Sequence, residues 1–143
     1  MIQVERQGLA SVALPELAEI SVLHPMLERF AELYPGIKRP PVASQWSMNY
    51  LSVMLPAMLA AVLTRERGIA FWEQEVALLH DAGQPRALWL PTLPASLAAQ
   101  QRDDYWARLL HEHLEPLFAG IAAWGGLAPK VLWGNFAAIW DGA

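Results

Sequence analysis

Cysteine is absent from this 143-residue sequence, and its absence excludes several kinds of site. The chain by itself contains no disulfide, thiolate nucleophile, cysteine-ligated zinc or cysteine-held iron–sulfur cluster. Charged residues are also scarce, at 17% of the sequence, with a net charge of −4 and no cluster of lysine or arginine. Because nucleic-acid binding depends on cations that neutralise phosphates, we do not expect a nucleic acid as the main partner.

The sequence also lacks a long uninterrupted hydrophobic run and a signal peptide. Its longest apolar segment, Leu51 to Leu63, contains Ser52 and Pro56. That segment is shorter than the roughly 18–20 residues needed to span a bilayer. The N-terminus carries Glu5 and Arg6 in place of a basic start followed by an apolar core. We therefore expect a cytoplasmic protein with no transmembrane span.

Apolar residues make up 55% of the sequence, and the chain contains seven tryptophans. This length and composition predict a single domain, residues 1–143, with a sizeable core. Apolar residues recur at helical spacing in four segments, which are 15–34, 42–67, 95–124 and the stretch from Pro129 onward. This last pattern is still short where the sequence stops, which we interpret as a truncated chain.

Prolines and glycines predict where these helices are interrupted or end. Pro25 should interrupt the first helix, and Pro56 should kink the second. Gly68 is expected to cap the second helix, and residues 39–41 to form an extended connector before it. Gly125-Gly126 should end the third helix.

A different pattern lies between the second and third helices. Two apolar, partly alternating runs, residues 69–79 and 86–90, flank a loop that contains Gly83. This arrangement predicts a β-hairpin, followed by a proline-rich linker at residues 91–94. The expected fold class is therefore α+β, mainly α-helical with one inserted antiparallel β-hairpin. Residues 1–39 should form an N-terminal helical segment.

The second helix carries two neighbouring stripes of candidate binding residues. Trp46 and Tyr50 form an aromatic face, beside a polar stripe of Gln45, Asn49 and Ser52. Buried amides cost free energy unless they are paired, so a ligand or a wet cleft would explain the polar stripe. Alternatively, these side chains cross-link neighbouring elements or face solvent.

The triplet Trp133-Gly134-Asn135 is the second candidate. A glycine inside a helix costs about 1 kcal/mol relative to alanine. Close approach of a ligand or of another backbone would explain Gly134, and so would tight helix packing.

We expect neither a metal site nor a catalytic residue in this chain. His111 and His113 are two residues apart and point in different directions on a helix, with His113 on the buried face. Asp103-Asp104 is interpreted as favourable charge at a helix start. The sequence contains no nucleotide-binding or hydrolase motif.

Three segments in order resemble the FhuF-like ferric-siderophore reductase family. Residues 44–64 begin Ser-Gln-Trp and continue as an aromatic-rich helix with an embedded proline. Leu114-Glu115-Pro116-Leu117 is similar to the family's L-x-P segment, and Lys130–Asn135 to its K-x-x-W-[GS]-N segment. The resemblance extends over residues 40–143.

The resemblance implies a cytoplasmic, siderophore-iron reductase-like protein of iron acquisition. It implies a ferric siderophore, of the hydroxamate type, and an electron-donor protein as partners. Family members hold a [2Fe–2S] cluster with four cysteines in a C-terminal segment that this sequence does not contain. Whether this chain is itself an enzyme is therefore open, and no cofactor is assigned to it.

The resemblance also suggests which residues meet the ligand. Trp46, Tyr50 and Trp133 would form apolar walls, and Gln45, Asn49 and Asn135 would offer amide hydrogen bonds to the chelate. Two alternatives stand beside this reading. One is a non-enzymatic siderophore-binding or interaction domain, and the other is a domain related to the C-terminal part of siderophore synthetases.

Overall fold

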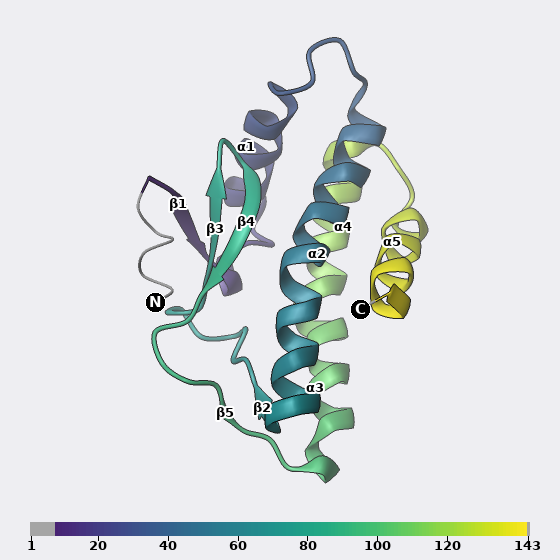
Figure 1. Cartoon of the computed structure of the whole chain (residues 1–143). Helices are drawn as coiled ribbons and strands as arrows, with labels where there is room; N and C mark the ends of the chain where they lie inside the picture. The colour runs from purple at the N-terminus through teal and green to yellow at the C-terminus, as the bar shows by residue number, and fades with distance from the viewer. Residues whose placement is uncertain (1–7, 143) are drawn as a thin grey trace.

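One long helix, α2 (Arg39–Arg65), runs through the centre of the fold (Figure 1). The computed structural model describes residues 8–142 of the chain. Four elements pack around α2. They are α1 (Ile20–Ala31), β4 (Gln84–Trp89), α4 (Glu115–Gly125) and α5 (Pro129–Gly142). The structure thus confirms a mainly helical α+β fold.

α2 begins three residues earlier than the sequence pattern indicated. The prediction that residues 39–41 form an extended connector is wrong, because Pro40 and Pro41 lie in the first helical turn. Backbone N–H groups in that turn have no intrahelical partner, so proline removes no bond there. The helix also continues through Pro56 to Arg65.

The expected glycine cap of α2 is also wrong. Glu66 adopts the left-handed conformation at the helix end, with φ 53°, and its N–H donates to the Ala61 carbonyl. Gly68 instead lies in β2 (Arg67–Gly68) and pairs with Ala95 of β5 (Ala95–Ser96). A Cβ at Gly68 would lie 3.0 Å from the Tyr105 ring, so the close approach of Tyr105 explains this glycine.

The predicted β-hairpin is present as β3 (Ala77–Asp81) and β4, joined by Ala82 and Gly83. Both turn residues have positive φ, which matches the twist of a tight hairpin. A third strand that we had not predicted, β1 (Ala10–Ala13), pairs antiparallel with β3. The sheet order is β1-β3-β4.

After β1 a short 3-10 turn (Leu14–Glu16) leads into α1. α1 passes through Pro25 without a break, so the predicted interruption is wrong. Pro25 deprives only the carbonyl of Ser21 of a helical partner, and Ser21 is exposed, so water can take that place.

The third predicted helix is shorter at its start and contains a wider turn. It runs as α3 (Arg102–Arg108), a π-helical turn (Leu109–Leu114) and then α4. Pro116, just after the π turn, has no N–H to donate to a carbonyl four residues earlier. Gly126 ends α4 in the left-handed conformation, in agreement with the predicted Gly-Gly stop.

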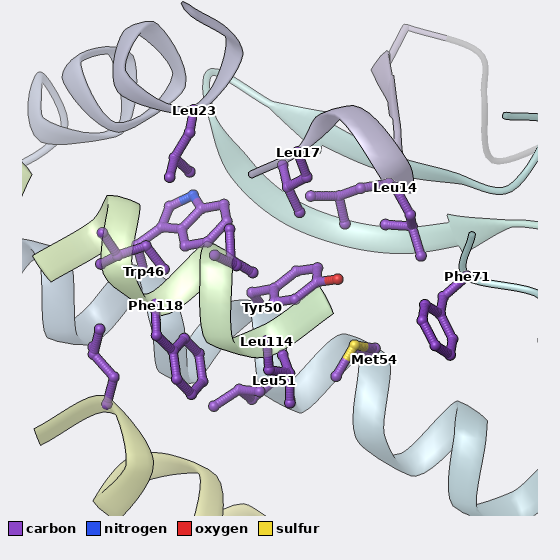
Figure 2. Packing of buried hydrophobic residues seen from close by; sticks show 14 of the residues in the cluster. Leu14, Leu17, Leu23, Trp46, Tyr50, Leu51, Met54, Phe71, Leu114 and Phe118 are labelled. Carbon is purple, nitrogen blue, oxygen red and sulfur yellow. The ribbon is translucent and has the colours of Figure 1, made fainter. Parts of the chain in front are cut away.

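The hydrophobic core lies between α2, the sheet and α4. Trp46 and Tyr50 of α2 are fully buried at its centre, with Leu17, Leu23 and Phe118 around them (Figure 2). Two of the aromatic residues that suggested a ligand site are therefore also the largest buried side chains of the fold.

Candidate ligand-handling site

The six predicted ligand residues fall into three separate environments in the structure. Gln45 is exposed, and its side-chain nitrogen donates to Asn49 Oδ1 at 2.9 Å. This amide pair lies on the outward face of α2. The polar stripe at this point therefore faces solvent, which was one of the two alternatives to a ligand cleft.

Trp46 and Tyr50 form the second environment, inside the core. Their rings stack 5.5 Å apart at an interplanar angle of 10°. Trp46 Nε1 donates to the Gly83 carbonyl at 2.8 Å and so ties α2 to the turn of the hairpin. The Tyr50 hydroxyl lies 2.5 Å from His113 Nε2 in the π-helical turn. Both polar atoms are therefore satisfied within the fold.

The third environment is the contact between α2 and α5. Asn135 Nδ2 donates to the hydroxyl oxygens of Ser44, at 3.0 Å, and Ser47, at 2.9 Å. Trp133 is half-buried against Phe118 of α4, with ring centroids 4.7 Å apart. Asn135 thus cross-links two helices, and Trp133 lies on the side of α5 that faces α4.

The structure contradicts tight helix packing, one of the two explanations offered for Gly134. Its position is exposed, and a Cβ placed there would meet no heavy atom within 4 Å. Tight packing within the described part of the chain therefore does not account for this glycine. The outward surface of α5 at Gly134 is open to solvent.

The histidines lie as the helical spacing predicted. His113 is buried and His111 is exposed. Burial lowers the pKa of His113 to about 4, so this imidazole is neutral at physiological pH. A small cavity of about 130 Å³ borders His113, beside Phe71 and Trp72. Among residues 8–142, no three His, Asp or Glu side chains are grouped so that they could hold a metal ion.

A cavity that was not predicted from the sequence lies at the other end of α2. Its volume is about 560 Å³, and it lies between the last turns of α2 and the linker that follows β4. Among the lining residues that the structure describes, only Arg65 is charged. The run of small residues at Ala57, Ala60 and Ala61, opposite a linker with two prolines, was the sequence signal that could have indicated it.

Comparison with known proteins gives the family. A family model described as ferric iron reductase FhuF-like transporter matches residues 44–143, which is most of the chain. The chain belongs to the FhuF-like family. The matched residues run from the second turn of α2 to residue 143 and so include most of α2, the hairpin, α4 and α5.

A curated relative of this FhuF-like chain is the ferric siderophore reductase of Escherichia coli (strain K12). The two are 24% identical over 97 residues, which is 66% of this chain and 37% of the relative. The chain therefore spans well under half the length of that relative.

The [2Fe–2S] cluster that the family resemblance implies does not fit the residues of this FhuF-like chain. All 143 residues lack cysteine, so the chain contributes no thiolate ligand.

α2 is the one helix within residues 8–142 that is long and apolar enough to cross a membrane by length and composition. The mean hydropathy of its apolar window is 1.4, and 39% of that window is buried. In the FhuF-like fold this helix packs against three helices and a strand, as the central helix of a folded domain does.

Proposed function

We propose that this FhuF-like chain handles a ferric siderophore in the cytoplasm so that its iron can be reduced and released. The family match over α2 to α5 is the observation that carries the proposal. The reducing electron would come from a cluster that is held outside these residues. One electron suffices, because ferrous iron binds the hard oxygen ligands of a hydroxamate chelate far more weakly than ferric iron does.

In this proposal, the residues of the chain bind and orient the chelate. Gln45 and Asn49 expose an amide donor and an amide acceptor side by side on α2, in reach of a ligand at the surface. Trp46, Tyr50 and Asn135 keep that stretch of α2 in place from behind, through the hairpin, the π turn and α5. We propose ligand contact for the first pair and a positioning role for the other three.

Trp133 also belongs to the proposed set, on a different face. Its ring is half-buried between Phe118 and Phe136, so part of it is accessible from solvent. Trp133 packs against α4, whereas the amide pair lies on the exposed face of α2. We therefore propose that the amide pair and Trp133 contribute independently.

The test is a titration with a ferric trihydroxamate siderophore, followed by tryptophan fluorescence. The gallium complex of the same siderophore, which has the same shape but no redox chemistry, serves as the redox-inert control. We expect saturable quenching at micromolar ligand and binding at least ten-fold weaker in a Gln45→Ala, Asn49→Ala double variant. Gln100→Ala, an exposed amide elsewhere, should bind as the wild type does. No quenching at tens of micromolar ligand would overturn the proposal.

The reductase proposal has a separate test in the reading frame that follows Ala143. Cysteines encoded there with the family's four-cysteine spacing would support reduction by one polypeptide. If the frame encodes none, a siderophore-binding domain without its own redox centre becomes the better description.

A further inference from the structure

The cavity of about 560 Å³ beside the end of α2 belongs to none of the residues proposed above for siderophore contact. Its volume lies within the range of roughly 300–1,000 Å³ that is typical of small-molecule sites. We propose that it binds a small organic carboxylate with an apolar body. The apolar part would lie between α2 and the linker, and the carboxylate would pair with Arg65.

The walls of the cavity are formed by residues that match an apolar ligand. On the α2 side the lining is made of small side chains, Ala57, Ala60 and Ala61, which leave room next to the helix. Larger apolar residues, among them Ile69, Trp89 and Leu93, face them. Leu93 is 72% exposed, so it has apolar surface that a ligand would cover.

The wall opposite α2, which is formed by the linker after β4, is held in place without a ligand. Its start is fixed by β4, and its end by the β2–β5 pairing. Arg67 Nη1 donates to the Pro94 carbonyl at 2.7 Å, and Leu97 N–H donates to the Glu66 carbonyl at 2.7 Å. Because both ends are tethered and Pro91 and Pro94 restrict the backbone between them, the cavity is largely preformed.

The charge of the cavity selects an anion. Within residues 8–142, Arg65 is the only charged residue that lines the cavity, and it makes no hydrogen bond or ion pair with any of these residues. Arg67, two residues later, donates its hydrogen bond to the linker, so Arg65 is the arginine that remains available to a ligand. A guanidinium beside apolar walls favours a carboxylate, which it can bind through two parallel hydrogen bonds.

The probe for this site is 8-anilinonaphthalene-1-sulfonate, an apolar aromatic anion whose fluorescence rises on burial. We expect one molecule to bind per chain and to be displaced by octanoate. Octanamide, which has the same length and no charge, should displace it at least ten-fold less well. The Arg65→Gln variant should bind the probe about ten-fold more weakly, since one charge-assisted pair is lost. Arg86→Gln, an exposed arginine on the sheet, is the matched control and should bind as the wild type does.

A second variant tests the cavity itself. Ala57→Trp places a large ring at an exposed position that lines it, and should abolish probe binding while circular dichroism and the melting temperature stay those of the wild type. Equal binding by wild type and Arg65→Gln would overturn the proposal, as would equal displacement by octanoate and octanamide. A wild-type dimer in analytical ultracentrifugation that excludes the probe would also overturn it, because a second copy would then be the occupant.

This site is independent of the proposed siderophore function. Probe binding that octanoate displaces and a ferric siderophore does not would establish the carboxylate site alone. Failure of siderophore binding at Gln45 and Asn49 would leave the carboxylate proposal intact.

Discussion

The hydroxyl of Tyr50 lies 2.5 Å from Nε2 of His113, and both side chains are buried. Burial raises the pKa of Tyr50 and lowers the pKa of His113, so the phenol keeps its proton and the imidazole stays neutral. The Tyr50 hydroxyl has no other partner within residues 8–142, so it donates and His113 accepts. One neutral hydrogen bond thus joins α2 to the π-helical turn.

Replacing Tyr50 with phenylalanine should lower the free energy of unfolding by about 1–3 kcal/mol, because Nε2 of the buried His113 is left without a donor. Urea denaturation measures the change. Tyr34→Phe removes a hydroxyl from an exposed ring and should change stability by less than about 0.5 kcal/mol. Equal losses in the two variants would show that the buried bond contributes nothing.

Stability should also depend on pH through His113. Its pKa is about 4 in the folded chain and 6.5 in the unfolded chain, so the unfolded chain binds more protons between these values. The free energy of unfolding should therefore fall as pH falls from about 6.5 toward 4, by up to about 1.4 kcal/mol per pH unit for one proton. The pKa of His80 is also lowered, chiefly by burial, and acts in the same direction.

The pH dependence can be assigned by comparing two variants in urea denaturation at several pH values. His113→Gln removes the titrating group and keeps an amide that can accept from Tyr50, so the slope between pH 4 and 6.5 should decrease. Gln100→Ala, which replaces an exposed side chain that does not titrate, should keep the wild-type slope. An unchanged slope in His113→Gln would contradict the assignment.

Asn135 is expected to be a structural residue whatever ligand the chain binds. Asn135→Ala removes hydrogen bonds to Ser44 and Ser47 between α5 and α2, and the Ser47 side chain is buried. The free energy of unfolding should fall by about 1–2 kcal/mol. Gln45→Ala removes an exposed amide and should have a much smaller effect in the same chemical denaturation experiment. A larger loss of stability in Gln45→Ala than in Asn135→Ala would contradict this prediction.

Two glycine substitutions should act in opposite directions. Gly134→Ala adds a methyl group in open space inside a helix and should raise the free energy of unfolding by about 0.5–1 kcal/mol. Gly125→Ala places a Cβ 2.5 Å from the Ala43 Cβ, so α4 and α2 must separate and stability should fall. Thermal denaturation monitored by circular dichroism distinguishes them. Destabilisation by Gly134→Ala would show that the α5 surface is covered in solution.

The helices and the hairpin could be predicted because their signals are local. Apolar spacing at a period of 3.6 marked α2, α4 and α5, and Gly83 between two apolar runs marked the hairpin turn. The predictions were wrong at the two ends of α2, where proline and glycine did not have their usual roles. Pro40 and Pro41 fit the first turn of a helix, and Glu66 took the left-handed position expected for a glycine.

The candidate site was harder to predict, since helical spacing does not tell which neighbour covers a face. Trp46 and Gln45 are adjacent in the sequence, yet one is fully buried and the other is exposed. The fold decided this, because the hairpin turn packs on the face of α2 that carries Trp46, whereas Gln45 lies on a face that stays exposed. The cavity beside Arg65 arises in the same way, from a linker fixed at a distance by β2 and β5.

By itself, the sequence determined the mainly helical α+β class, the hairpin, the absence of any cysteine ligand and the resemblance to the FhuF-like family. These depend on composition, on short-range periodicity and on motifs in order along the chain. Only the tertiary structure decided that Trp46, Tyr50 and Asn135 hold the fold together while Gln45, Asn49 and Arg65 face outward. The physical reason is that burial depends on contacts between segments far apart in the sequence, as in the bond from Tyr50 to His113.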